Sequence, residues 1–332
     1  MNTLGVVIPC HRQERFLPRT LAALRSLPEG WRVEGALVLA TPQGVDSAPP
    51  ALDPDWKWLA PNPGAAREPL TPGAARMAGL AACGGEWVLF VDADVEVDAA
   101  WLARALGETA SANRSRLAGL WGPIEEWFVD DRGHESRGAP DLYRVGMRDR
   151  NVDYLATLAL YRRSALLDAG GYDPRLRSEE DFELGLRLRA RGSELRSLGC
   201  LAARHFSAPR PSLGELSRRW SSGLCFGQGQ VLRLYLGKPG FGTLLRRQAL
   251  YLATLALWAA LPLAAWIAAV RSTPAPLLAW LAVAAAGIAA MAVRKRSARL
   301  AAHSVLAWTL NGLGLVVGWF RIDPRAPREA PC

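Results

Sequence analysis

Three long stretches in the last third of the chain contain no charged residue, and they constrain the fold more than any other feature. They cover residues 248–270, 272–293 and 300–320, which is 23, 22 and 21 residues. A bilayer core about 30 Å thick needs roughly 20 apolar helical residues, so each stretch is long enough to cross a membrane. We therefore predict two to three transmembrane helices within residues 248–322, followed by a tail at 323–332; buried helices of a soluble domain are the alternative.

The charges divide into an acidic first part and a basic last part. The net charge of the 332 residues is +9, which by itself would favour nucleic acid as a partner. However, residues 1–215 hold 29 of the 31 acidic residues, whereas residues 216–322 hold no acidic residue and 12 basic ones. The basic excess thus belongs to the apolar end, where membrane lipids are the expected partner, and we predict no nucleic-acid partner.

Basic residues mark one side of the first two apolar stretches. Only Arg271 lies in the short loop between them, whereas six basic residues flank their other ends. By the positive-inside rule these stretches form a hairpin with the preceding domain in the cytoplasm, which predicts a multi-pass protein of the cell inner membrane. The third stretch contains His303 and Asn311, and its crossing is left open. The six flanking residues are Arg246, Arg247, Arg294, Lys295, Arg296 and Arg299.

We interpret residues 211–247 as an amphipathic, membrane-proximal segment. Leu216 and Trp220 recur at helical spacing beside Arg218 and Arg219. Such a helix can lie in the headgroup layer, where anionic lipid contributes about 1 kcal/mol per basic residue. A helix that docks two domains on each other is the alternative.

Residues 1–210 alternate short apolar runs with amphipathic runs, which predicts an α/β domain with a mainly parallel sheet. Strands are expected at residues 4–8, 33–39 and 87–91. Pro9 is expected to end the first strand. Thr71 and Pro72 predict the N-cap and the first turn of a helix.

Two carboxylates follow the strand at residues 87–91. Asp92 and Asp94 stand one residue apart at its carboxyl end, where α/β folds bind ligands, and together they can hold Mg²⁺ or Mn²⁺. Ordinary turn chemistry is the alternative reading of this pair. Asp98 is expected to cap the next helix.

A second acidic group opens a later helix. Residues 178–183 carry four acids in five positions, which exceeds what a helix cap requires, although Ser178 and Asp181 resemble a capping box. A carboxylate at this place could take a proton from an attacking hydroxyl. His205 follows a strand expected at residues 195–198, and alone it would be an ordinary surface or core histidine.

In this order the motifs resemble the family 2 glycosyltransferases of the GT-A fold, which is Rossmann-like. The resemblance covers residues 4–206: VVIP, a Gly-Ala-Ala-Arg helix, GGEWVLFVDAD, LYRRSALLDAGGYDPRL, SEEDFELGLRLRARG and the late histidine. It implies a metal-dependent, inverting enzyme that moves a sugar from a nucleotide-sugar donor. Anchoring by apolar helices makes a lipid-linked or cell-envelope glycan acceptor the expected second substrate.

The resemblance also implies roles for residues on the donor side. Asp92 would contact the ribose and the metal, and Asp94 would bind the metal, with His205 as a further ligand. Arg76 would lie near the donor phosphates, and Pro9 is placed with the donor-binding residues.

On the acceptor side, the Glu-Asp pair Glu180 and Asp181 would be catalytic, with Asp181 as the base that deprotonates the acceptor hydroxyl. Membrane-bound processive synthases of this family carry Gln-x-x-Arg-Trp after that pair. Here Arg219 and Trp220 stand at a compatible place and are weak acceptor-binding candidates, while Leu216 replaces the Gln. A polymer-secreting channel is not expected.

Three departures from the family pattern cluster at the nucleotide-base pocket. Residues 10–14 replace the usual Asn-Glu, residues 40–44 replace an acidic base contact, and Met77 replaces an Asn. Asp46 could substitute for the missing acid. These changes leave open a catalytically degenerate membrane scaffold or a glycan-binding partner of another synthase.

Two other enzyme classes fit the sequence poorly. A haloacid dehalogenase phosphatase also has an Asp-x-Asp strand end, but Glu96 stands where it needs Thr or Val, and the only downstream lysines are Lys238 and Lys295. A dinucleotide enzyme would show GxGxxG after the first strand, and that motif is absent from the sequence.

Overall fold

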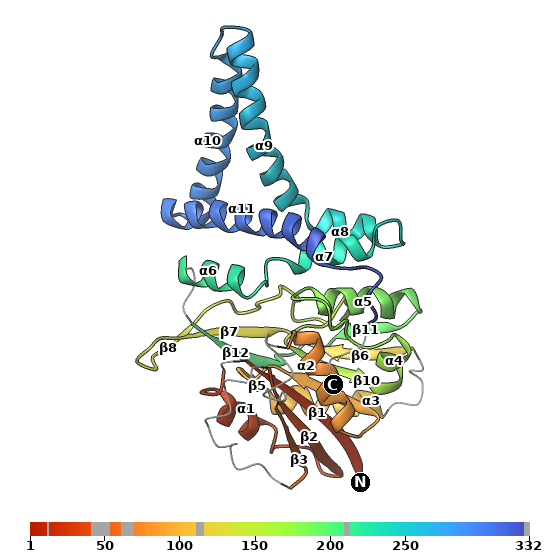
Figure 1. Ribbon diagram of the computed structural model, residues 1–332. Coiled ribbons are helices and arrows are strands. Elements are labelled where there is room, and N and C mark those ends of the chain that lie inside the picture. The colour runs from red at the N-terminus through yellow and green to blue at the C-terminus, as the bar shows by residue number, and fades with distance from the viewer. Residues whose placement is uncertain (12, 41–53, 61–69, 111–115, 209–212, 329–332) are drawn as a thin grey trace. The chain divides into compact units, whose positions relative to one another are not determined.

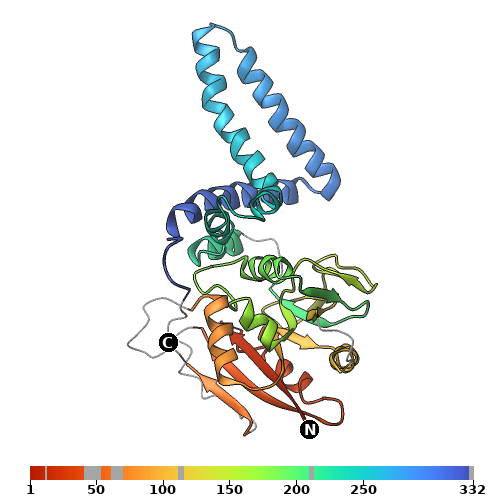
Figure 2. The same ribbon diagram turned by 90° about the vertical axis from the view of Figure 1, so that its right-hand side faces the viewer.

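The computed structural model describes residues 1–11, 13–40, 54–60, 70–110, 116–208 and 213–328. The chain forms two compact units. Unit 1 combines Met1–Pro209 with Pro327–Cys332, and unit 2 is Arg210–Ala326. Figures 1 and 2 show the elements of each unit from two sides.

Unit 1 is built on an eight-stranded sheet in the order β3-β2-β1-β4-β10-β6-β11-β9. The strands β1 to β4 pair in parallel, whereas β10 runs antiparallel to both β4 and β6. The sheet is therefore parallel in its first half and mixed in its second. The strands are β1 (Asn2–Cys10), β2 (Trp31–Leu39), β3 (Trp56–Leu59), β4 (Trp87–Val91), β6 (Leu117–Trp121), β9 (Arg150–Asn151), β10 (Leu158–Arg162) and β11 (Glu194–Ser197).

A second sheet of four strands has the order β5-β12-β7-β8. Its strand β12 runs antiparallel to β5 and parallel to β7. His205 pairs with Val95 in this sheet, so the late histidine comes back beside the chain that follows the Asp92–Asp94 turn. The strands are β5 (Val95–Val97), β7 (Ile124–Val129), β8 (Glu135–Arg137) and β12 (Ala203–Ser207).

Among the residues that the structure describes, unit 1 has five helices, and two of them begin at the caps expected from the sequence. Thr71 Oγ1 accepts a hydrogen bond from the Ala74 N–H, and Pro72 follows at the first helical position. Asp98 Oδ1 accepts from two N–H groups of the next helix. The helices are α1 (Leu17–Ala23), α2 (Pro72–Ala82), α3 (Ala99–Thr109), α4 (Arg163–Asp168) and α5 (Glu180–Ala190).

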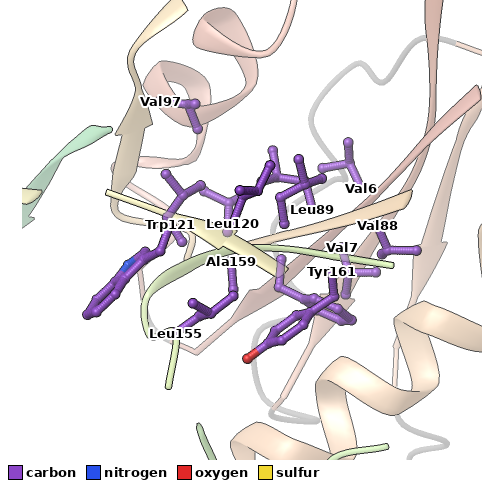
Figure 3. Packing of buried hydrophobic residues seen from close by; sticks show 14 of the residues in the cluster. Val6, Val7, Val88, Leu89, Val97, Leu120, Trp121, Leu155, Ala159 and Tyr161 are labelled. Carbon is purple, nitrogen blue, oxygen red and sulfur yellow. The ribbon is translucent and has the colours of Figure 1, made fainter. Parts of the chain in front are cut away.

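The core of unit 1 lies on both faces of β4. All five residues of this strand are buried, as expected of a continuous apolar run covered on both sides. Figure 3 shows Val88 and Leu89 of β4 among buried side chains of β1, β6 and β10. This packing holds the end of β4 rigidly, and the Asp92–Asp94 turn starts there.

Two local expectations were wrong. Pro9 does not end the first strand, because β1 continues to Cys10; beyond Val7 it pairs with β2 alone, and one missing N–H is tolerated where a strand has a single neighbour. The N-cap of α5 is Glu179 in a left-handed conformation (φ 65°) without a side-chain cap bond, so Ser178 does not form the capping box.

Unit 2 consists of helices. Three of them are long and apolar enough to cross a membrane, namely α9, α10 and α11. The helices are α6 (Leu213–Ser221), α7 (Gly227–Leu234), α8 (Phe241–Arg247), α9 (Ala249–Val270), α10 (Ala275–Lys295) and α11 (Ala298–Arg321).

Glycines let α7 and α11 approach each other closely. A Cβ atom on Gly229 would lie 1.8 Å from Leu315 O, and one on Gly318 would lie 1.9 Å from Phe226 O. Gly314 meets the Cys225 backbone in the same way. The two backbones therefore touch along one face of α11, and no larger residue fits there.

Candidate active site

The Asp92–Asp94 turn is fixed by backbone hydrogen bonds from two directions. The Asp92 N–H donates to Thr157 O at 3.0 Å, and the Phe206 N–H donates to Asp94 O at 2.9 Å. Thr20 Oγ1 also donates to Ala93 O at 2.9 Å. Strands β10 and β12 and helix α1 thus hold the turn, which orients both carboxylates.

Arg76 of α2 joins this turn to the start of α5. Its Nη2 donates to Asp92 Oδ1 at 3.0 Å, and its Nη1 donates to Glu180 Oε1 at 2.6 Å. Asp181 Oδ1 lies 3.7 Å from the same Nη1. The Arg76 and Glu180 side chains are buried, being 6% and 8% exposed. One guanidinium therefore brings together three carboxylates from two distant parts of the sequence.

The carboxylates of this cluster outnumber its cations. Burial raises the pKa of Asp92 to about 6, although Arg76 opposes the shift. Burial likewise raises the pKa of the Asp181 carboxyl well above its ordinary value. The positive charge of Arg76 lowers that pKa, but by less than burial raises it. A carboxylate with a raised pKa holds a proton more strongly, which suits a general base.

Asp94 and His205 form the other half of the site. His205 Nε2 lies 3.5 Å from Asp94 Oδ2, and both side chains are about one-tenth exposed. Gln13 Nε2 donates to the same Asp94 Oδ2 at 2.8 Å. Asp94 Oδ1 is buried and accepts no hydrogen bond from the described residues.

The contacts of Asp94 fit a bound divalent cation. A buried carboxylate oxygen without a donor, next to an imidazole and a second carboxylate, is the kind of donor set that Mg²⁺ or Mn²⁺ accepts. Yet within the described residues no three His, Cys, Asp or Glu side chains converge into a complete metal-binding group. Asp94 and His205 are the converging pair, while Asp92 is held by Arg76.

The other candidates are described by the elements that carry them. Pro9 lies near the end of β1. Arg219 and Trp220 belong to α6 in unit 2, where the Trp220 ring contacts the Phe226 ring edge-on at 5.3 Å. Met77 accepts a hydrogen bond at Sδ from the Tyr172 N–H at 3.3 Å and so serves packing. Residues 41–44 and Asp46 lie outside the described residues.

Gln13 was not among the site residues predicted from the sequence. It follows β1 in a segment where the family pattern fails, and glutamine has no chemistry that marks it as a site residue. Only the fold brings it to Asp94, 81 positions along the chain.

Residues 66–169 match the sequence model described as Glycosyl transferase family 2. Within these residues the chain has the sequence pattern of a family 2 glycosyltransferase domain. The match agrees with the predicted family resemblance. It includes Arg76 and the Asp92–Asp94 turn, and it favours a transferase over the phosphatase and dinucleotide-enzyme alternatives.

Relatives of known name agree with this family. The chain is 32% identical over 133 residues to the pre-mycofactocin glycosyltransferase of Mycobacterium tuberculosis, in strains CDC 1551 / Oshkosh and ATCC 25618 / H37Rv. The match covers 38% of this chain and only 28% of those relatives. Among solved structures, the mannosyltransferase PcManGT from Pyrobaculum calidifontis, in complex with GDP-Man and Mn²⁺, is similar at a TM-score of 0.59 and 18% identity. That similarity covers 96% of this chain and 87% of PcManGT, and it confirms the predicted GT-A-like fold class.

Proposed function

We propose that this protein is an inverting, metal-dependent glycosyltransferase. It moves a sugar from a nucleotide-sugar donor to a lipid-linked or cell-envelope glycan acceptor at the cytoplasmic face of the inner membrane. The observation that carries the proposal is the Arg76 cluster, because one buried guanidinium joins the Asp92–Asp94 turn to the Glu180–Asp181 pair. The donor-binding and base-carrying parts of a transferase would thus lie in one site.

Arg76 and Asp92 would act on the donor. A nucleotide-sugar carries a diphosphate, which a buried guanidinium can bind once it exchanges part of its carboxylate contacts. Asp92 would accept hydrogen bonds from the ribose. The complex of PcManGT with GDP-Man supports this donor class.

Asp181 would act on the acceptor. As the acceptor oxygen bonds to the anomeric carbon of the sugar, the bond from that carbon to the diphosphate oxygen breaks, and the acceptor proton passes to the Asp181 carboxylate. Attack from the side opposite the leaving group inverts the anomeric centre. The raised pKa of Asp181 supports this role, because the base must keep the proton that it receives.

Asp94 and His205, with Asp92, would hold Mg²⁺ or Mn²⁺. Such an ion, when bound, neutralises the charge that develops on the leaving diphosphate. Gln13 positions Asp94 by its hydrogen bond to Oδ2, which leaves Oδ1 available.

The helices α9 and α10 would anchor the protein as a hairpin. Both are long and apolar, and very little of either is buried within the protein, which fits contact with lipid. The basic residues at their outer ends support a cytoplasmic catalytic unit. An anchored enzyme meets lipid-linked acceptors at the membrane surface.

Donor turnover by the detergent-purified protein tests the proposal. Release of nucleoside diphosphate is measured with Mn²⁺ and a panel of UDP-, GDP- and TDP-sugars, with membrane lipid extract as the acceptor source. We expect one donor to turn over, and we expect Asp94→Asn and Asp181→Asn each to reduce turnover at least 100-fold. Asp168→Asn is the matched control, because Asp168 is an exposed carboxylate at the end of α4. Donor binding without turnover in every combination would instead favour the scaffold alternative.

A further inference from the structure

The chain after α11 returns to the catalytic unit. Arg328 Nε lies 3.2 Å from Asp173 Oδ2, and Arg328 Nη2 lies 3.5 Å from Glu183 Oε1. Both carboxylates are fully buried at 0% exposure, and Pro327–Cys332 belongs to unit 1 together with Met1–Pro209. Unit 2 therefore begins and ends at the same water-soluble unit.

This connection limits how often unit 2 can cross a bilayer. A chain that leaves one side and returns to it crosses an even number of times. The seven residues from Ile322 to Arg328 reach at most about 25 Å when fully extended, which is less than a hydrocarbon core of about 30 Å. Three crossings are thus incompatible with the Arg328 contacts, and one of the three candidate helices does not cross.

Helix α11 is the one that differs from the other two. It has the lowest hydropathy of the three, and a third of its most apolar window is buried, against 6% for α9 and none for α10. It contacts the first half of α9, where Gly312 lies against Leu255 and Trp258 Nε1 donates to Thr309 Oγ1 at 2.9 Å. Figure 1 shows α11 running across the ends of α9 and α10 and not alongside them.

The large apolar side chains that α11 exposes lie on one face of the helix. Leu306, Leu313, Val316 and Phe320 are 40%, 44%, 44% and 81% exposed, and their spacing places them on a single face. The opposite face carries the glycines that pack on α7. A helix with one protein-covered face and one apolar open face suits the boundary between headgroups and acyl chains.

The charges at the two ends of α11 favour an anionic surface. Arg299 lies in its first turn and Arg321 in its last, and Arg294, Lys295 and Arg296 stand exposed just before it. Residues 216–322 contain no acidic residue, so the carboxylates that the described part of unit 2 contains are Glu215 in the first turn of α6 and Asp323 just after α11. Anionic lipid headgroups supply the missing charge at about 1 kcal/mol per basic residue.

We infer that α11 is an in-plane membrane helix, which lies in the interface of an anionic bilayer on the catalytic side and presents Leu306, Leu313 and Phe320 to the acyl chains. Only α9 and α10 cross. This inference rests on the proposed anchoring by those two helices and is independent of the transfer reaction.

Depth measurement by spin labelling tests the inference on the full-length protein. Single cysteines are placed at the positions from 304 to 320, leaving out Gly312, Gly314 and Gly318, which have no room for a side chain. For comparison, single cysteines are placed from 279 to 291 in α10. The background carries Cys200→Ser and Cys332→Ser, while Cys10, Cys83 and Cys225 are buried and stay. The protein is reconstituted in vesicles of phosphatidylglycerol and phosphatidylcholine, and collision with O₂ and with a water-soluble nickel complex reports the depth of each label.

For α11 we expect depth to oscillate with a period of 3.6 residues, with maxima at 306, 313 and 320 and no trend along the helix. For α10 we expect a continuous change through the bilayer centre. A continuous change in α11 overturns the inference, and so does an α10 that stays at the surface, which would also remove the proposed anchoring. Neither outcome alters the donor-turnover assay, so failure of the topology and failure of the catalytic proposal are distinguishable.

A reporter fused after Cys332 gives a second, independent measurement. The in-plane arrangement predicts a cytoplasmic signal. A signal from the outer side contradicts it.

Discussion

Arg76 Nη1 donates a hydrogen bond to Glu180 Oε1 at 2.6 Å, and this pair joins the first half of α2 to the start of α5. Both side chains are buried, so each depends on the other for its charge to be tolerated. The same guanidinium reaches Asp92. Arg76 therefore belongs both to the candidate active site and to the buried packing of unit 1.

Removing the Arg76 charge should destabilise unit 1 strongly. We expect Arg76→Met to lower the free energy of unfolding by about 3–5 kcal/mol, because it leaves buried carboxylates without a partner. Arg76→Met combined with Glu180→Gln should recover part of that loss, since the double change removes one of those charges. Thermal and denaturant unfolding of Arg76→Met, of Glu180→Gln and of the double variant gives the coupling energy. Additive losses would show that the pair is not coupled.

Asp92→Asn should stabilise the protein while it inactivates it. The pKa of Asp92 is raised by burial to about 6 in the folded chain, against 3.8 ordinarily, so between these values the folded state binds more protons than the unfolded state. Stability therefore falls as pH rises through this window and stays lower above it. We expect Asp92→Asn to add about 1–3 kcal/mol at pH 7.5 in EDTA, because a quarter of the side chain is still exposed. The gain should disappear near pH 4, and a gain that is equal at both pH values would argue against this cause.

Gln13 should control metal affinity through Asp94. We expect Gln13→Ala to weaken the apparent affinity for Mn²⁺ about 10- to 100-fold, because a group that orients a metal-binding carboxylate is lost. Turnover at saturating Mn²⁺ should change much less. Gln13→Glu places a like charge beside Asp94. We expect this variant to lose turnover at saturating Mn²⁺ in addition to losing affinity for Mn²⁺. Titration of donor turnover with Mn²⁺ separates the two effects, and an unchanged Mn²⁺ midpoint in Gln13→Ala would remove Gln13 from the site.

The glycines of α11 should tolerate no side chain. Gly318→Ala places a methyl group 1.9 Å from Phe226 O, so we expect it to cost about 1–3 kcal/mol through a shift of α11 from α7. Gly287→Ala in α10 is the matched control, because no atom lies within 4 Å of its new Cβ and alanine favours the helix by about 1 kcal/mol. Thermal unfolding in detergent should separate the pair, and equal melting temperatures would contradict the packing of α7 on α11.

The elements with strong local signals could be predicted from the sequence. The five residues of β4 were predicted as they stand, because a run buried on both faces needs no alternation. Thr71 and Asp98 were predicted as caps, because their side chains satisfy N–H groups within three residues.

Features that depend on distant partners could not be predicted. Pro9 was expected to end β1, but whether a proline interrupts a strand depends on how many neighbours that strand has, which is a property of the sheet. The contact of Gln13 with Asp94 and that of Arg328 with Asp173 likewise arise only when distant segments meet. The third apolar stretch has the length of a span, yet its contacts with α7 and α9 come from the tertiary structure.

Unit 1 is made of two segments of the chain, with unit 2 between them. The two segments of unit 1 are therefore synthesised at different times. The ribosome releases the strands and helices of the first segment before any of the apolar helices, and domains fold as they emerge. Arg328 follows α9, α10 and α11 in the chain, so its contacts with Asp173 and Glu183 can form only after those helices have been synthesised. The last ion pairs of unit 1 therefore form only in a chain that has been completed through unit 2.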